Sequence, residues 1–420
     1  MNAMEVTSKV LERFDLNKKL LLSFILTAIT IISLISFISI NRSEDALKTE
    51  IGINFQHQAS SAMEKIDACL FERYGDVQAF ASNNLAIQKL QGNDVEESFQ
   101  NYINKMVVLY GYYDLMILVD IQGKIIKTNI VKPDGSEFFD SAYLIWKDES
   151  QSDWFKKCTS GKIKKGESYY SEPYFDEDLI RFYKSKVPSM IFAAPVYDKD
   201  NKIIGVWANY VNTRKVMSTI TSNMITQNKK KGINTFQVLI VDKNQKIIDD
   251  MQKPADILVF NFKHKLQSIN KAVAGVDSFM VEKNVRAGYI QINGFALSKG
   301  QGDYKGDGWA CMTRVQTAEA FAPIRNLTYL LVIVGVVLLV LVAIITFLFA
   351  KFMIYDIGRF GNFLNNTTKD IVNGKLDTRG DPKLVGIDFR ILVEHTNMLI
   401  DSFVKPINIT AEYVDRISKG

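Results

Sequence analysis

The sequence has few of the residues that most often build catalytic or metal sites. It contains three cysteines and three histidines in 420 residues, and neither type is clustered. Cys69, Cys158 and Cys311 are far apart and odd in number, which argues against a disulfide framework and favours buried thiols. No Walker A, HExxH or GxSxG motif occurs. The sequence therefore predicts a protein that is not an enzyme and needs no metal or cofactor.

The sequence also lacks a strong charge of one sign. Lys and Arg number 51 against 46 Asp and Glu, and both signs are spread along the chain. Without a concentrated basic face, nothing points to nucleic acid as a partner. Four glycines cluster within 300–308, but no helix with a Lys-Ser/Thr pair follows them. The cluster predicts a loop and not a phosphate site.

Two long apolar runs are the strongest positive feature of the sequence. Residues 20–40 and 327–350 contain no charged side chain. A helix needs roughly 20 apolar residues to cross the hydrocarbon core of a bilayer. Both runs meet that length and neither has the polar face of a buried core helix. We expect two transmembrane helices, and the first is an uncleaved anchor because no small-x-small cleavage site follows it.

The basic residues near the two runs predict their orientation. More of them precede the first run than follow it, and more follow the second run than precede it, as is typical of cytoplasmic flanks. Both termini are then cytoplasmic in a bacterial inner (plasma) membrane, with segment 1–19 inside and 41–326 outside. The residues counted are Lys9, Arg13, Lys18, Lys19, Arg42 and Lys48 for the first run, and Arg314, Arg325, Lys351, Arg359 and Lys369 for the second.

An internal repeat organises the outer region. Residues 117–126 read ILVDIQGKII and residues 239–248 read LIVDKNQKII, with a partial copy, VYDKDNKII, at 196–204. Each copy predicts a hairpin whose Asp opens a polar turn. We therefore expect a long helix over 42–110, a membrane-distal sheet module over 110–212 and a membrane-proximal module over 235–315.

This order resembles the double Cache domain, a pair of PAS-like folds found in bacterial chemoreceptors and sensor kinases. The resemblance covers about 45–325 and includes SDWF at 152–155, YSEPYFD at 170–176 and YKGDGW at 304–309. It implies a small-molecule ligand bound in the first module. In relatives that bind amino acids an Arg and a later Asp grip the ligand, but Ser152 and Tyr210 stand at those positions here. The residues left for a small organic ligand are Trp154, Tyr170, Tyr174 and Asp176, and the carboxylate and the aromatic faces favour a cation. The alternative is that these aromatic residues belong to the core.

The cytoplasmic end changes to heptad spacing. Apolar residues within 357–371 and again within 389–403 alternate at intervals of three and four, as in helices that pack together. This segment resembles a HAMP domain, over 351–403, and 404–420 resembles the start of a second one. Such short helices are stable as a parallel four-helix bundle in a homodimer. We expect the chain to stop before a methyl-accepting signalling hairpin.

These features together predict an α+β protein. Two transmembrane helices flank an extracytoplasmic double Cache domain, which is followed by cytoplasmic HAMP helices. The sequence is identified as a member of the methyl-accepting chemotaxis receptors, a homodimer that would act on a chemotaxis histidine kinase and coupling protein if the full-length protein carries the signalling hairpin. The alternatives are the input region of a sensor histidine kinase or nucleotide cyclase, or a membrane-anchored binding protein without output.

Overall fold

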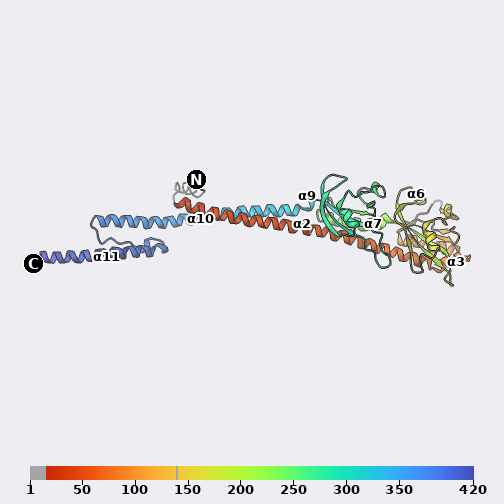
Figure 1. Ribbon diagram of the computed structural model, residues 1–420, viewed down its shortest axis with the longest axis horizontal. Helices are drawn as coiled ribbons and strands as arrows, with labels where there is room; N and C mark the ends of the chain where they lie inside the picture. Colours follow the sequence, from red (N-terminus) through yellow and green to blue (C-terminus); the bar gives the residue numbers. More distant parts are fainter. Residues whose placement is uncertain (1–15, 139–140) are drawn as a thin grey trace. The chain divides into compact units, whose positions relative to one another are not determined.

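The fold was analysed in a computed structural model, which describes residues 16–138 and 141–420 (Figure 1). Most of the segment predicted to be cytoplasmic, 1–19, lies outside the described residues. The chain divides into two compact units, residues 45–324 and the remainder of the chain. Helices and antiparallel sheets are both present, which confirms the α+β class.

The structure divides the long helix predicted over 42–110 into three helices. These are α2 (Leu16–Ala81), α3 (Asn84–Leu90) and α4 (Glu96–Tyr110). Asn83 is extended, and its side-chain oxygen accepts the N–H of Leu85 as an N-cap, which starts a new helix. Gly92 has φ 84°, a left-handed conformation that ends α3. Helical periodicity predicts that this segment is helical, whereas these two residues determine where one helix ends and the next begins.

The first sheet follows α4 and carries its own small helices. Its order is β2-β1-β6-β5-β3, with β4 paired to β5, and all pairs are antiparallel. Two helices, α5 (Asp153–Thr159) and α6 (Glu177–Tyr183), lie in the long connection between β2 and β5. The strands are β1 (Tyr113–Asp120), β2 (Ile125–Thr128), β3 (Tyr169–Tyr170), β4 (Tyr174–Phe175), β5 (Pro188–Tyr197) and β6 (Ile203–Asn212).

Helix α7 (Thr213–Lys230) leads to a second sheet with the same plan. Its order is β8-β7-β11-β10-β9, again antiparallel throughout. Helix α8 (Gln267–Val273) packs on this sheet, and α9 (Thr317–Ala320) follows its last strand. The strands are β7 (Gln237–Val241), β8 (Ile247–Asp250), β9 (Ser278–Lys283), β10 (Ile290–Leu297) and β11 (Ala310–Gln316).

The three repeated Asp residues close three hairpin turns in the same way. Asp120, Asp198 and Asp242 each use Oδ1 to accept the backbone N–H groups of the residues two and four positions later, at 2.8–3.0 Å. A short carboxylate can replace a backbone acceptor in such a turn. The hairpins predicted from the repeat are therefore present and have a common cause.

The main core lies between α2 and the inner faces of the two sheets. The face that α2 turns to this core is apolar, and its residues Ile66, Leu70, Val77, Phe80 and Ala81 are all buried there. Figure 1 shows α2 running along both sheets. Separate apolar clusters cover the outer faces of the first and second sheets. Each sheet is thus covered on both faces, and its outer face carries the small helices and long loops.

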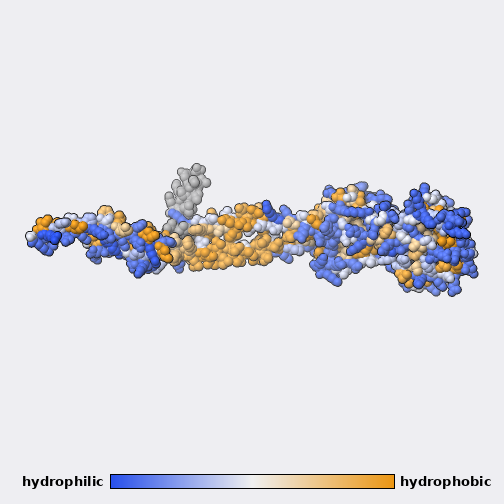
Figure 2. Space-filling view, turned by 90° about the horizontal axis from the view of Figure 1, so that it is seen from below, coloured by the Kyte–Doolittle hydropathy of each residue, from blue (hydrophilic) through white to orange (hydrophobic). Residues whose placement is uncertain are grey.

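The other unit contains two helices that are long and apolar enough to cross a membrane. One is the start of α2, and the other is α10 (Ala322–Val372). The most apolar segment of α2 is 0% buried and that of α10 is 6% buried. Phe24 and Phe349 meet edge to face at 6.5 Å between ring centroids. Figure 2 shows the continuous apolar surface of these helices. Helix α10 continues without a break past residue 350, and a connector then leads to α11 (Ile387–Ser418), which runs through Pro406.

Candidate ligand-binding site

A cavity of about 280 Å³ lies on the outer face of the first sheet, beside α5. Strand alternation points Tyr210 to this face, while its neighbour Asn209 is buried toward the other side with Trp207. Trp154, the second residue of α5, closes the cavity from above the sheet. The lining residues are Lys147, Glu149, Ser152, Asp153, Trp154, Tyr169, Ser171, Tyr174, Asp176, Ile191 and Tyr210.

Asp176 has a structural role as well as a place in the lining. Its Oδ1 accepts the N–H of Leu179 at 3.0 Å and so caps α6, while its Oδ2 accepts the hydroxyl of Tyr174 at 3.1 Å. Burial raises the pKa of the Asp176 carboxyl above its ordinary value. Burial and the neighbouring Asp176 also raise the pKa of Tyr174, so its hydroxyl remains a donor. The cavity thus presents a fixed tyrosine–carboxylate pair.

The balance of charge in the cavity is acidic. Glu149, Asp153 and Asp176 line the cavity with one ammonium group, that of Lys147, and Asp153 also pairs with Lys157 outside the lining at 2.8 Å. Lys147 Nζ already contacts Glu149 Oε1 at 3.2 Å and Asp178 Oδ2 at 2.5 Å. Burial opposes the charge on Lys147, but these two carboxylates outweigh it and raise its pKa. The arrangement favours a cation, which can contact carboxylates and the faces of the aromatic rings.

The structure brings three of the four predicted site residues together. Trp154, Tyr174 and Asp176 line the cavity, with Trp154 only 4% exposed. Tyr170 lies on the inner face of the sheet, where its ring packs against Phe192. The alternation of side chains along β3 separates it from Tyr169, which does line the cavity.

Sequence reasoning missed Lys147, Glu149 and Tyr169. Lys147 and Glu149 lie in the irregular segment after β2, which is held against the sheet edge by Glu149 N–H donating to the carbonyl of Gly123 at 2.7 Å. The sequence shows that acidic residues are frequent in 148–153. It does not show that their side chains lie near Trp154. Within the described residues, no group of three or more His, Cys, Asp or Glu side chains is arranged to hold a metal.

A larger groove of about 650 Å³ lies between α3 and the segment 164–167. Its basic side chains, Lys164, Lys165 and Lys199, are exposed. Its carboxylates are already engaged, because Glu167 accepts the N–H of Lys164 and Asp198 accepts turn amides. The smaller cavity, with buried aromatic walls and converging acids, is the better ligand site.

The segment after β3 connects the cavity to the second sheet. Glu172 accepts a hydrogen bond from Trp309 Nε1 at 3.2 Å and pairs with Lys243 at 2.8 Å. The ring of Tyr170 meets that of Tyr304 at 5.0 Å. Tyr170 and Glu172 therefore contact the second module, while their neighbours Tyr169 and Ser171 line the cavity.

The Gly-rich loop at 300–308 lies at the same junction. Asp67 of α2 accepts the N–H groups of Lys299 and Gly300, at 3.0 and 2.9 Å, and the hydroxyl of Ser298 at 2.6 Å. Asp307, at the other end of the loop, accepts the hydroxyl of Tyr304 at 3.1 Å, and burial and the nearby Glu172 raise its pKa to about 7. The loop predicted here belongs to the second module and therefore connects it to α2 and to the first module.

Comparison with known families agrees with this architecture. A Cache domain model matches residues 43–324, and a HAMP domain model matches residues 385–420. No curated protein matches the chain.

Three solved structures illustrate the likeness of part of this chain to known proteins. A domain of a sensory box/GGDEF family protein from Vibrio parahaemolyticus has 12% identity and a TM-score of 0.49, over 64% of this chain and 98% of that one. The ligand-binding domain of the Pseudomonas fluorescens chemoreceptor CtaA, in complex with L-alanine, has 16% identity and a TM-score of 0.42, over 63% and 97%. An extracellular ligand binding receptor from Desulfohalobium retbaense has 11% identity and a TM-score of 0.42, over 62% of this chain and 40% of its own length.

The fold and the matched domains define the class of this protein, which is a sensor with an input region of two sheets and a HAMP domain. The chain belongs to the Cache domain family, which the match over residues 43–324 establishes. The HAMP match and the two candidate membrane helices indicate a transmembrane sensor or transducer. Both matched domains are sensory domains.

Proposed function

We propose that this protein is a transmembrane chemoreceptor that binds a small organic cation outside the cytoplasm and relays the signal to a chemotaxis output. The observation that carries the proposal is the acidic, aromatic cavity of the first Cache module, in the same chain as a HAMP domain. Of the predicted residues, Trp154, Tyr174 and Asp176 are the proposed ligand contacts. Tyr170 has a different role, because it faces the second module.

The class of ligand follows from the charges of the lining. A ligand ammonium would meet Glu149, Asp153 and Asp176, whereas a ligand carboxylate would meet the same three groups with one cation, Lys147, that is already paired twice. Charged groups inside a partly dehydrated site interact more strongly than at the surface. The cavity of about 280 Å³ suits a compact amine.

The membrane arrangement extends this proposal. Residues 20–40 and 327–350 would cross the bacterial inner membrane, with residues 41–326 outside and both termini in the cytoplasm. The exposed apolar surfaces of α2 and α10 support the two spans, and the basic residues that flank them support the orientation. Residues 351–403 would form one HAMP relay and residues 404–420 the start of a second.

The surface of α11 supports the proposal of a homodimer. Val393, Ile400 and Val404 are buried within the chain. On the same helix Leu399 and Phe403 are 60% and 66% exposed, too apolar a stripe for a free cytoplasmic surface. A second copy would cover this stripe in a parallel four-helix bundle. The relay would then act on a chemotaxis histidine kinase and its coupling protein, if the full-length protein carries a signalling hairpin.

The test is binding of defined amines to the full chain in lipid nanodiscs. Choline and putrescine are titrated against thermal unfolding, with betaine and succinate as a zwitterion and a dianion of similar size. We expect at least one amine to stabilise the protein in a saturable way, by about 2.7 kcal/mol at 100 times its Kd. Stabilisation by succinate but by neither amine would overturn the proposed ligand class.

Two variants locate the site. Asp176→Asn keeps the helix cap, because Asn and Asp are equally good N-caps, but removes the charge. We expect it to weaken amine binding at least tenfold while unfolding within a few degrees of the parent. Tyr170→Phe is the matched control outside the cavity and should bind the amine as the parent does. Equal loss in both variants would contradict the placement of the site.

A further inference from the structure

The two sheets can be superposed strand by strand through the internal repeat. Ile117 in the first copy of the repeat corresponds to Leu239 in the second copy. Two residues earlier, Leu115 pairs with Tyr210 across β1 and β6, and Gln237 pairs with Arg314 across β7 and β11. Arg314 therefore occupies the place in the second sheet that Tyr210, which lines the ligand cavity, occupies in the first.

The next strand extends the correspondence. Ile191 lies opposite Tyr210 in the first sheet and lines the cavity, and Asn293 lies opposite Arg314 in the second. Gln291 is two residues before Asn293 and so points to the same outer face. Where the first module has apolar and aromatic side chains on this floor, the second has an arginine and two amides, all of them buried.

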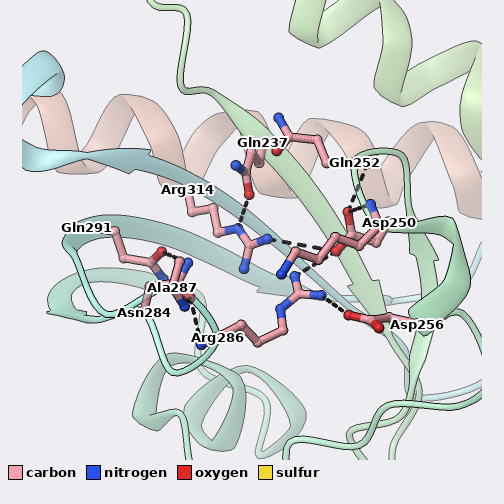
Figure 3. Close-up of polar contacts among 10 residues, drawn as sticks. Gln237, Asp250, Gln252, Asp256, Asn284, Arg286, Ala287, Gln291 and Arg314 are labelled. Carbon is pink, nitrogen blue, oxygen red and sulfur yellow. Dashed lines mark hydrogen bonds and ion pairs between the residues drawn. The ribbon is translucent and has the colours of Figure 1, made fainter.

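A loop between β9 and β10 brings a second arginine over this polar floor (Figure 3). Arg286 Nη2 contacts Asp250 Oδ2 at 2.6 Å, and its Nη1 contacts Asp256 Oδ2 at 2.6 Å. Arg314 donates from Nε to Gln237 Oε1 at 2.7 Å. Its Nη2 lies farther from Asp250 Oδ2, at 3.8 Å. The two guanidinium groups thus share one deeply buried carboxylate.

Three buried polar atoms of this cluster have no hydrogen-bond partner among the described residues. They are Arg286 Nε, Gln291 Nε2 and Asn293 Oδ1. The other amide atoms fix their orientation: Gln291 Oε1 accepts from Asn284 at 2.8 Å, and Asn293 Nδ2 donates to Glu282 at 2.6 Å. Buried polar groups are nearly always paired, so two free donors and one free acceptor on one floor point to a guest molecule.

The most deeply buried charges of the cluster, and its free N–H donors, favour an anionic guest. The side chains of Arg286, Arg314 and Asp250 are 6%, 5% and 1% exposed, so the deeply buried part has two positive charges against one negative. Asp256 is 29% exposed and lies on the solvent side. The Glu282 carboxylate accepts hydrogen bonds from the N–H groups of Gln267 and Ser268 at the start of α8. Burial and the neighbouring Arg286 lower the pKa of Arg314 to about 10, which a monovalent anion would reverse.

The apolar cluster beside the polar floor limits the size of the guest. Leu239, Phe262, Phe295 and Met312 are all fully or almost fully buried and fill the rest of this outer face. A ligand as large as one for the first module would have to displace them. The polar side chains that a guest could contact are therefore confined to the end of the sheet under the Arg286 loop.

We propose that the second Cache module carries its own binding site, for a small monovalent hydroxycarboxylate, on the floor formed by Arg314, Gln291 and Asn293 under Arg286. The carboxylate accepts from the free N–H groups of Arg286 and Gln291 and from Arg314. The hydroxyl donates to Asn293 Oδ1. This site takes a ligand opposite in charge to that of the first cavity, and it does not depend on the function proposed for that cavity.

The experiment titrates the full chain in nanodiscs with sodium glycolate, sodium acetate and sodium chloride at equal ionic strength, and follows thermal unfolding. We expect saturable stabilisation by glycolate, at least threefold weaker binding of acetate, which lacks the hydroxyl, and none by chloride at the same concentration. No saturable effect of glycolate, or the same effect from chloride, overturns the proposal and assigns the cluster a structural role filled by water.

Variants separate this site from the first cavity. Arg314→Gln should weaken glycolate binding at least tenfold. If that variant does not fold, Gln291→Leu removes a free donor without changing the charge and should weaken binding at least fivefold. Asp176→Asn, in the first module, should leave glycolate binding unchanged, so failure of one site is distinguishable from failure of the other. Undiminished glycolate binding in Gln291→Leu refutes the site.

Discussion

Asp249 offers a sharp test of the energetics of the second module. It is 1% exposed on β8, opposite Ile240 of the inner core, and neither carboxylate oxygen has a hydrogen-bond partner among the described residues. Burial, reinforced by Asp250, raises the pKa of Asp249 from 3.8 to about 7, and Arg214 and the nearby hydroxyl of Thr221 oppose this rise only in part. The folded protein therefore holds this proton more tightly than the unfolded chain does.

The sign of the pH dependence follows from that difference. Between about pH 4 and pH 7 the folded state binds more protons at Asp249, so the free energy of unfolding falls as pH rises and levels off above about pH 7. At roughly 1.36 kcal/mol per pKa unit, the full cost of ionising Asp249 is about 4 kcal/mol at most. Local relaxation and water entry reduce such costs, so we expect about 2 kcal/mol.

Asp249→Asn removes this cost while keeping the shape of the side chain. We expect the variant to be more stable than the parent by about 2 kcal/mol at pH 8, a rise in Tm of roughly 4–8 °C, with the difference shrinking toward pH 4. Tryptophan fluorescence of the full chain measures this directly, because the Cache unit contains Trp146, Trp154, Trp207 and Trp309, the four tryptophans of the sequence.

The control is Asp200→Asn, at an exposed turn position, which should leave the Tm unchanged at every pH. An Asp249→Asn advantage of equal size at pH 4 and pH 8 would mean that ionisation of this carboxyl is not the cause. A loss of stability at pH 8 would mean that the charge of Asp249 is paired in solution, and would refute the reasoning.

Two further predictions concern transmission. Trp309→Phe keeps a buried ring but removes the hydrogen bond to Glu172; it should cost about 1–2 kcal/mol in thermal unfolding and leave amine affinity within threefold, whereas a tenfold loss would place Trp309 in the ligand site. A cysteine at Leu399, on the exposed stripe of α11, should crosslink two copies in membranes far faster than one at Glu394; equal rates at the two positions would remove the case for the bundle.

Much of the architecture can be predicted from the sequence because it depends on local patterns. An apolar run long enough to cross a bilayer can be recognised from its length and composition alone, so residues 20–40 and 327–350 identify candidate membrane helices. The Asp that opens each repeated turn bonds to backbone groups only a few residues away, so the hairpins at Asp120, Asp198 and Asp242 follow from short segments.

The candidate site depends on contacts that the sequence does not record. Trp154 and Asp176 stand out locally, but Lys147 and Glu149 join them because an irregular segment docks on the sheet edge. In the same way, only the paired registers of the two sheets show that Arg314 takes the place of Tyr210.

Tyr169 and Tyr170 show most clearly where sequence reasoning ends. The sequence by itself determines that two adjacent tyrosines lie in a short strand, and strand alternation requires them to point to opposite faces. Which face carries the candidate cavity and which carries the junction is decided by the position of α2, whose packing makes the face of Tyr170 the inner one. A shift of one residue in register would exchange the two side chains, so only the tertiary structure could assign them.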